Sequence, residues 1–494
     1  MKKILLLFVS AILSVGLFAQ NENDALRYSL INYSGTARFT GMSGAYGAVG
    51  ADFSTLSQNP AGIGLYHKTE FTITPAFANS NTQSDYINSS NKDYRNTLYL
   101  ANAGYVMSLK LNENNGSHLK LIQLGFGMNR MAMFNNRMIV DGLNNNNSLM
   151  TNFLSDANES GPYPEDLSSS YYQFGAGVAY DANLLFQDTN NYWQADLPFG
   201  GLYQTRMIES RGGTTETALS AGSNFEDKFY FGVTFGFPHI NYEQESVHTE
   251  KDNNNLSPFL KSFEYSEYLH TKGSGFNFKF GFIYKPVAFF RIGGAFHTPT
   301  SYFDMNDSWN TSMTSYFDQP PLTSSNATSF TADSKDGTYD YRLTTPMRAL
   351  GSLAFIFGQN GILSADYEYI DYSTSRLNGL HATNDDFLDA NNAIRSSLTT
   401  AHNLRIGTEW KAGIFAFRGG YSIYGSPYKG EVMTGLGSRQ GYSLGIGIRE
   451  KFYFLDFSYN HMQSDDNYYI YADAPKSENK YKSNVFSITS GFRF

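Results

Sequence analysis

The 494-residue sequence contains no cysteine. Disulfides therefore contribute nothing to its fold, and a lipid-anchored lipoprotein, which needs a cysteine for the lipid, is excluded. Charged residues are also scarce, at 16% against about 25% in average globular domains. Beyond the first 17 residues there is no long apolar run. A membrane protein built from spanning helices, each of which needs about 20 apolar residues, is excluded as well.

The start of the chain has the layout of a secretory signal peptide. Met1, Lys2 and Lys3 form a short basic start, Ile4 to Leu17 is almost entirely apolar, and the small residue Ala19 follows. We therefore expect residues 1–19 to be a signal peptide and the mature protein to act outside the cytoplasm.

Aromatic residues and glycine are abundant, with 40 Phe, 36 Tyr and 45 Gly. This composition suits a sheet that faces lipid, because its rims need aromatic residues and its turns need glycine. The net charge is −9, and loss of Lys2 and Lys3 with the signal peptide would make it −11. Because an acidic chain is not drawn to phosphate backbones, nucleic acid is not an expected partner.

Residues 67–494 contain one alternating segment after another, in which apolar side chains occupy one face and polar side chains the other. A soluble β-sandwich also alternates, but here charged residues stand next to glycine on the polar face of strand after strand, which fits a polar lumen. The last segment ends on Phe494, as outer-membrane barrels do, and a closed barrel leaves no exposed sheet edge. The sequence therefore predicts an all-β protein: a transmembrane antiparallel barrel of about 14 strands in the bacterial outer membrane, in contact with its lipid and inserted by the barrel-assembly machinery. The clearest alternating segments are 276–284, 290–297, 403–410, 415–423, 442–449, 453–460 and 485–494.

The predicted connections are of two kinds, as in outer-membrane barrels, which have short turns on one side and long loops on the other. Tight turns are expected at 284–286, 411–413 and 450–451. Long loops rich in Asn, Asp and Ser are expected at about 139–200, 298–335, 371–397 and 462–480, with short helices at Ser148–Asp156 and Asp385–Arg395.

Residues 20–66 differ from the rest because they are rich in small residues and show little alternation. Gly41, Gly44, Gly47 and Gly50 recur at every third position, and glycine permits close packing. Asn59-Pro60 should turn the chain. We expect this segment to be a hatch that fills the barrel.

This segment resembles the N-terminal hatch of the FadL/TodX family of outer-membrane channels for long-chain fatty acids and aromatic hydrocarbons. The resembling residues are Ala37-Arg38, Gly41 to Tyr46, Ala48, Asp52 and above all Asn59, Pro60, Ala61 and Gly62. Segments 403–407, 417–421, 426–428 and 453–456 are similar to the closing strands of the family.

The resemblance implies passive uptake of hydrophobic small molecules. A ligand would be captured outside, enter an apolar pocket, shift the hatch and leave sideways into the membrane through a gap where an inward kink breaks the pairing of an early strand. We place the candidate kink at Gly125, Phe126 and Gly127, because glycine in a strand often marks a bulge. Plain barrel packing accounts for these glycines equally well.

Charged residues on the polar faces of the closing strands form a second candidate site. An arginine cluster can hold a ligand carboxylate bidentately. The interpretation we favour is that the arginines pair with Asp and Glu and dock the hatch. The residues are Arg405, Arg418, Arg449 and Arg493, with Glu409 and Asp456.

No enzyme chemistry, cofactor or metal site is expected. Gly441-Tyr442-Ser443-Leu444-Gly445 matches the nucleophile pattern of hydrolases, but that pattern requires a strand–turn–helix elbow, and here it lies within an alternating strand. The nine histidines are scattered without the spacing of metal ligands. The alternative functions are a partner-binding barrel, similar to type IX secretion shuttles, and a haem receptor.

Overall fold

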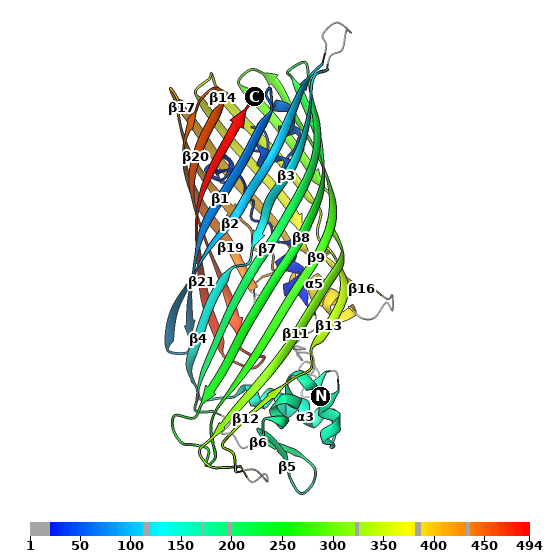
Figure 1. The fold of residues 1–494 in the computed structure, drawn as a ribbon, viewed down its shortest axis with the longest axis vertical. Helices are drawn as coiled ribbons and strands as arrows, with labels where there is room; N and C mark the ends of the chain where they lie inside the picture. The colour runs from blue at the N-terminus through cyan, green and yellow to red at the C-terminus, as the bar shows by residue number, and fades with distance from the viewer. Residues whose placement is uncertain are drawn as a thin grey trace, which may run out of the picture.

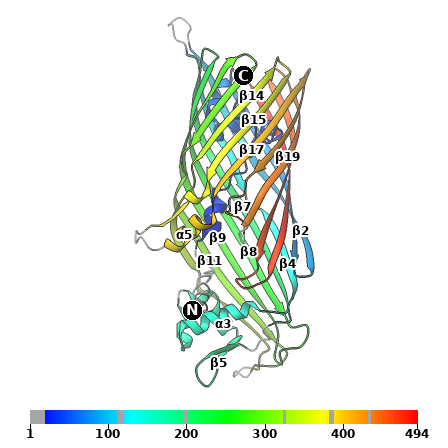
Figure 2. The same ribbon diagram turned by 180° about the vertical axis from the view of Figure 1, so that it is seen from behind.

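The protein is an antiparallel barrel closed by 14 strands, with residues 20–66 packed inside it (Figures 1 and 2). The computed structural model describes residues 20–111, 119–169, 171–195, 200–321, 326–380, 387–430 and 435–494. The predicted signal peptide lies outside these ranges. The barrel closes where the first strand, β1 (Glu70–Tyr86), pairs with the last, β21 (Lys476–Arg493), from Glu70 opposite Arg493 to Tyr86 opposite Ser477.

Ten of the 14 strands are single elements, and four consist of consecutive segments. The single strands are β1, β2 (Ser89–Lys110), β7 (Leu202–Phe225), β8 (Phe229–Lys251), β9 (Leu260–Val287), β17 (Thr400–Ala412), β18 (Phe415–Tyr424), β19 (Gly435–Arg449), β20 (Tyr453–Tyr469) and β21. The segmented strands are β3 (Leu119–Met133) with β4 (Asn136–Asn144), β10 (Phe290–His297) with β11 (Ser301–Phe317), β12 (Ser329–Asp333) with β13 (Gly337–Thr344) and β14 (Arg348–Phe357), and β15 (Gly361–Asp371) with β16 (Arg376–Gly379).

The outer surface of the barrel carries an apolar band, which follows from the alternation of the strands. Along β20, Tyr453, Leu455 and Phe457 are exposed, whereas Phe454, Asp456 and Ser458 are buried. The same pattern recurs on strand after strand, so the predicted outer-membrane type of barrel is confirmed. Among the described residues, no helix is both long and apolar enough to span a bilayer.

The end of the barrel opposite the tight turns carries the long connections. Between β4 and β7 the chain forms α3 (Leu149–Ser160), α4 (Ala176–Asp181) and the small hairpin of β5 (Leu185–Gln187) and β6 (Trp193–Ala195), which pack on the rim of the barrel through Phe153 and Tyr265. The helices predicted near 148 and 385 correspond to α3 and α5 (Leu388–Ser397). The loop predicted at 298–335 is wrong, because β11 and β12 extend through much of it. The alternation signal is weak there because the inward face of β11 mixes apolar residues, such as Met305 and Met313, with polar ones, such as Asp307 and Thr311.

Residues 20–66, called the hatch below, lie inside the barrel (the dark-blue segment in Figure 1). The hatch contains two helices, α1 (Glu22–Ser29) and α2 (Ala37–Thr40), and two 3₁₀ segments, η1 (Phe53–Ser57) and η2 (Pro60–Leu65). Its side chains from Thr36 to Tyr66 are buried almost throughout. The hatch is therefore a packed core element rather than a loose tail.

Candidate functional site

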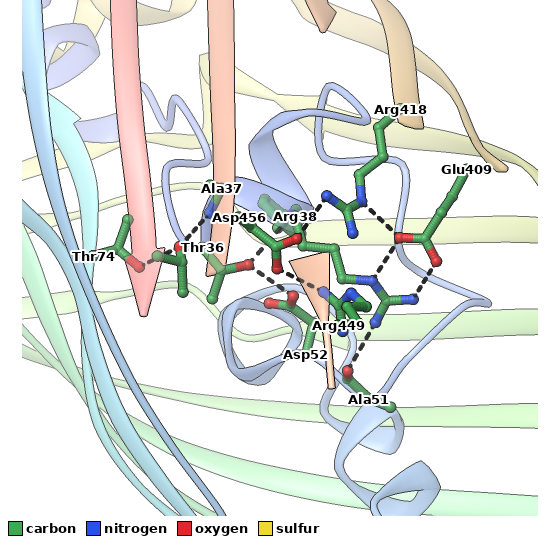
Figure 3. Close-up of polar contacts among 12 residues, drawn as sticks. Thr36, Ala37, Arg38, Ala51, Asp52, Thr74, Glu409, Arg418, Arg449 and Asp456 are labelled. Carbon is green, nitrogen blue, oxygen red and sulfur yellow. Dashed lines mark hydrogen bonds and ion pairs between the residues drawn. The ribbon is translucent and has the colours of Figure 1, made fainter. Parts of the chain in front are cut away.

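The hatch is held to one side of the lumen by a buried charge cluster (Figure 3). Arg38 in α2 donates from Nε and Nη2 to the two carboxylate oxygens of Glu409 on β17, at 2.9 and 3.0 Å, and from Nη1 to the carbonyl of Ala51 at 3.1 Å. Burial alone would lower the pKa of the Arg38 guanidinium, but the adjacent Glu409 raises the pKa well above its usual value. Arg38 therefore stays charged, and its bidentate pairing fixes α2 against the wall.

The cluster continues along the neighbouring strands as alternating charges. Arg418 on β18 contacts Glu409 at 2.6 Å and Asp456 at 2.8 Å, and Arg449 on β19 contacts Asp456 at 2.7 Å. These arginines are thus paired with the predicted acids, as in the interpretation that we favoured from the sequence.

The two remaining predicted arginines pair with acids that the sequence reasoning did not single out. Arg405 contacts Glu368 on β15 at 3.0 Å, and Arg493 contacts Glu70 on β1 at 2.8 Å. Glu368 also binds Arg348. Glu368 belongs to the alternating polar face that also carries Asp366, so the periodicity of β15 could have identified it. Each predicted arginine is therefore engaged by a carboxylate.

Small residues bring the hatch and the wall into direct contact. The hydroxyl groups of Ser43 and Ser443 are 2.8 Å apart, those of Thr40 and Ser458 are 2.7 Å apart, and a Cβ on Gly420 would lie 2.5 Å from the backbone of Met42. Ser443, the serine of the hydrolase-like pattern, lies within β19 and also accepts a hydrogen bond from the amide of Ser43. It is thus part of the hatch contact and has no nucleophile elbow around it.

The Asn59-Pro60-Ala61-Gly62 motif forms the turn into η2. The Asn59 amide nitrogen donates to the carbonyls of Gly47 at 2.6 Å and Phe282 at 3.2 Å, while its oxygen accepts from the Ala61 amide at 3.1 Å. A Cβ on Gly281 would lie 1.9 Å from that oxygen. Asn59 therefore joins two parts of the hatch to the wall, and the wall glycine provides the room.

The candidate kink at Gly125, Phe126 and Gly127 is placed wrongly by the sequence prediction. The three residues pair regularly with β2 and with β7, and Phe126 points outward. A Cβ on Gly127 would clash with the hatch residue Phe53, and one on Gly125 with Leu56. These glycines provide room for hatch side chains, which is the packing explanation that the sequence left open.

The strand is irregular a few residues later, at a bulge. Arg130 pairs with Thr215 and Ala132 with Thr214, so Met131 is an extra residue in β3. The neighbouring strand β7 bends here too, since Gly212 has a φ of +104°, a conformation that favours glycine. The carbonyl of Met131 accepts a hydrogen bond from the hatch amide of Asn32 at 2.8 Å. A bulge bends a strand, so β3 changes direction at Met131.

Beyond the bulge, backbone pairing is lost on one side. The ladder between β2 and β3 ends at Asn102 opposite Asn129, and among the described residues no ladder joins β2 residues 89–101 to residues 130–144 of β3 and β4. On their other sides, β2 stays paired with β1, and β4 stays paired with β7. This interruption is called the seam. Leu98, close to the point where the ladder ends, is 77% exposed.

Side chains span the seam in place of the backbone. Arg137 on β4 forms an ion pair with Asp93 on β2 at 3.0 Å, and Asn91 donates to Asp141 at 2.7 Å. Because polar side chains at least partly open to water hold this contact, it is weaker than a ladder of backbone hydrogen bonds.

A small cavity lies between the hatch and the wall, beside the bulge at Met131. Its apolar side is formed by Tyr28, Leu30, Ile31, Met131, Pro238 and Tyr302, and its polar side includes Glu216, Lys279 and Arg348. The bulged residue Met131 therefore contacts the seam, the hatch and the cavity at once. Within the described ranges, no three His, Asp or Glu side chains are grouped so that they could hold a metal ion.

Comparison with known proteins identifies the fold. No protein-family model matches the sequence, and no curated protein matches it significantly. Solved structures do match: a FadL homologue of Pseudomonas aeruginosa superposes with a TM-score of 0.53 at 12% identity, covering 94% of this chain and all of that chain. The toluene transporter TodX of Pseudomonas putida gives 0.53 at 10% identity, covering 94% and 99%. The chain thus has the FadL-type fold, in agreement with the sequence resemblance.

Proposed function

We propose that this protein is a channel for the passive uptake of hydrophobic small molecules, which leave the lumen sideways through the seam. The observation that carries the proposal is the seam itself, an interruption of the barrel wall that begins beside the apolar residues Leu98 and Leu100 on the outer surface. A hydrophobic molecule that leaves through the seam enters the lipid directly and does not cross water. The fold shared with a toluene transporter supports the same class of ligand.

The hatch is placed to control this route. Its segment 28–32 closes the inner side of the seam, through the hydrogen bond from Asn32 to Met131 and through the edge-to-face contact of Tyr28 with Phe134, at a centroid distance of 6.0 Å. The cavity beside the bulge is small, so a ligand must displace this segment. A ligand that binds the displaced form better shifts the equilibrium towards it.

Deletion of Met131 tests the route directly. Without the extra residue, Ala132 would follow Arg130 in register with β7, and β4 would realign against β2. Cells that lack the gene and produce the deletion variant should lose most uptake of labelled toluene and oleate. The purified variant should still migrate as a folded barrel in gel electrophoresis when the sample is not heated. The matched control is deletion of Lys120, the residue between Leu119 and Leu121 where β3 is also irregular, far from the seam; it should leave uptake unchanged.

If the Met131 deletion transports as well as the parent chain, the seam is not the exit. If the parent chain itself takes up neither ligand, the transport proposal fails and the barrel is better explained as a partner-binding protein.

A further inference from the structure

Three residues that line the cavity have a buried polar atom without a hydrogen-bond partner among the described residues: Tyr28 in the hatch, and Thr214 and Glu216 on the wall. Tyr28 lies in the segment that a ligand displaces, so the two wall atoms remain. Glu216 and Thr214, neighbours on one face of β7, are 1% and 5% exposed, and both line the cavity. In the part of the chain that the structure describes, Glu216 Oε1 and Thr214 Oγ1 have no hydrogen-bond partner. A buried polar atom without a partner costs free energy, so a group that completes both bonds would bind favourably.

The rest of the polar side is already engaged. Glu216 Oε2 accepts from Lys279 and, at 3.1 Å, from Asn277. Arg348 donates to Glu368 at 3.2 Å and to the carbonyl of Ser29. Lys279 and Arg348 are therefore each paired with a carboxylate, and the oxygen that has no partner, Glu216 Oε1, belongs to an acid.

These contacts determine which polar group the cavity can accept. A ligand carboxylate would meet the free oxygen of Glu216 without an unpaired cation to offset the repulsion. A hydroxyl group suits both atoms, because it donates to Glu216 Oε1 and accepts from the Thr214 hydroxyl. The apolar residues of the wall, Met131, Pro238 and Tyr302, suit the remainder of such a molecule.

We propose that the ligand class of this channel is neutral amphiphiles that carry one hydroxyl group, such as phenols and alcohols, bound through Glu216 and Thr214, in preference to carboxylates or plain hydrocarbons. The inference rests on the proposed transport function and names its ligand class. It differs from the carboxylate site considered for the closing-strand arginines, which are all paired.

Three labelled probes of one shape test the proposal: p-cresol, p-xylene and p-toluate, which carry a hydroxyl, a methyl and a carboxylate group opposite the same methyl. Binding is measured by equilibrium dialysis against the full chain in detergent, and uptake is measured in cells that produce it. A hydrogen bond to a charged group should make p-cresol bind about tenfold more tightly than either of the other two.

The variant Thr214→Val isolates the polar contact. Valine has nearly the shape of threonine, and no protein hydrogen bond is lost, since Thr214 Oγ1 has none. We expect p-cresol to bind about fivefold more weakly and p-xylene within about twofold of the parent. The matched control is Ser84→Ala on β1. It also removes a buried hydroxyl that has no hydrogen-bond partner, but Ser84 does not line the cavity, so neither affinity should change.

The outcomes separate this inference from the function on which it rests. Preference for p-toluate or p-xylene would overturn the hydroxyl class but leave transport intact. Unchanged p-cresol binding in Thr214→Val would mean that these atoms hold only water, and would overturn the site. Failure of all three probes to bind or enter cells would overturn both proposals.

Discussion

The two sides of the lumen hold the same hatch in different ways. On the side formed by β17 to β21, called the anchored wall, each strand pairs with the next. The hatch is fixed there by the buried ion pair between Arg38 and Glu409 and by hydroxyl contacts from α2 and its neighbours. On the seam side, the ladder between β2 and β3 ends early, and segment 28–32 contacts β3 through a single backbone hydrogen bond at Met131.

This difference indicates how a packed hatch can still move. A plug held equally on all sides would have to leave as a unit, at the cost of its buried ion pair with the wall. Here the ion pair between hatch and wall lies on the anchored wall. The contacts of segment 28–32 beside the cavity are the hydrogen bond to Met131, a hydrogen bond from Arg348 to the Ser29 carbonyl, and aromatic packing. Displacement of segment 28–32 therefore leaves the ion pair between Arg38 and Glu409 intact and opens a part of the wall that already lacks backbone pairing.

The largest expected effect is on the anchored wall. Glu409→Gln leaves the buried guanidinium groups of Arg38 and Arg418 facing a neutral amide, and removal of one partner from a buried ion pair costs about 3–5 kcal/mol. Urea unfolding should show this loss, and limited proteolysis should cleave the hatch. The exposed acid in Glu478→Gln serves as the control and should change neither measurement. A hatch that stays protected in Glu409→Gln would show that the ion pairs are not its anchor.

Crosslinks can test the asymmetry within one chain, because the protein has no cysteine of its own. Asn32→Cys/Met131→Cys joins the hatch to the seam strand, and when oxidised it should lower toluene uptake more than about tenfold, with recovery in reductant, since a disulfide holds the segment in place. Ser43→Cys/Ser443→Cys, on the anchored wall, should leave uptake within about twofold. Equal losses in both pairs would mean that the whole hatch must move.

The anchored wall could largely be predicted from the sequence, whereas the seam could not. Alternation places Arg418 and Asp456 on the lumen face of their strands, and the spacing of small residues around Gly41 and Gly44 marks a segment that packs closely. Both are properties of the local sequence, so they can be recognised without knowledge of the fold.

The seam depends instead on how neighbouring strands align. The bulge at Met131 exists because β3 has one residue more than β7 between two ladder pairs, and the glycine with the unusual backbone, Gly212, is on β7 rather than on β3. Glycines within β3, such as Gly127, provide room for the hatch instead. No pattern within one strand distinguishes these two uses of glycine.

A smaller effect is expected from filling a hatch-facing glycine. A Cβ on Gly420 would lie 2.5–2.8 Å from backbone atoms of Met42 and Ser43, which cannot rotate away, so Gly420→Ala should cost about 1–3 kcal/mol in urea unfolding. Gly351 on β14 is the matched control, because a Cβ there meets nothing within 4 Å, and Gly351→Ala should be neutral. Similar stability of the two variants would refute close packing between hatch and wall.

The smallest effect is expected where side chains span the seam. Arg137→Ala removes the ion pair with Asp93, whose partners are 39% and 14% exposed, and such pairs contribute about 0–1 kcal/mol. Stability should hardly change. If this contact helps to hold the seam closed, uptake should rise by about twofold at most. The difference in uptake between variant and parent should shrink at high salt, because screening weakens the ion pair in the parent. A fall in uptake would instead assign Arg137 to the ligand path, and would mean that the polar side chains of the seam guide the molecule rather than restrain the wall.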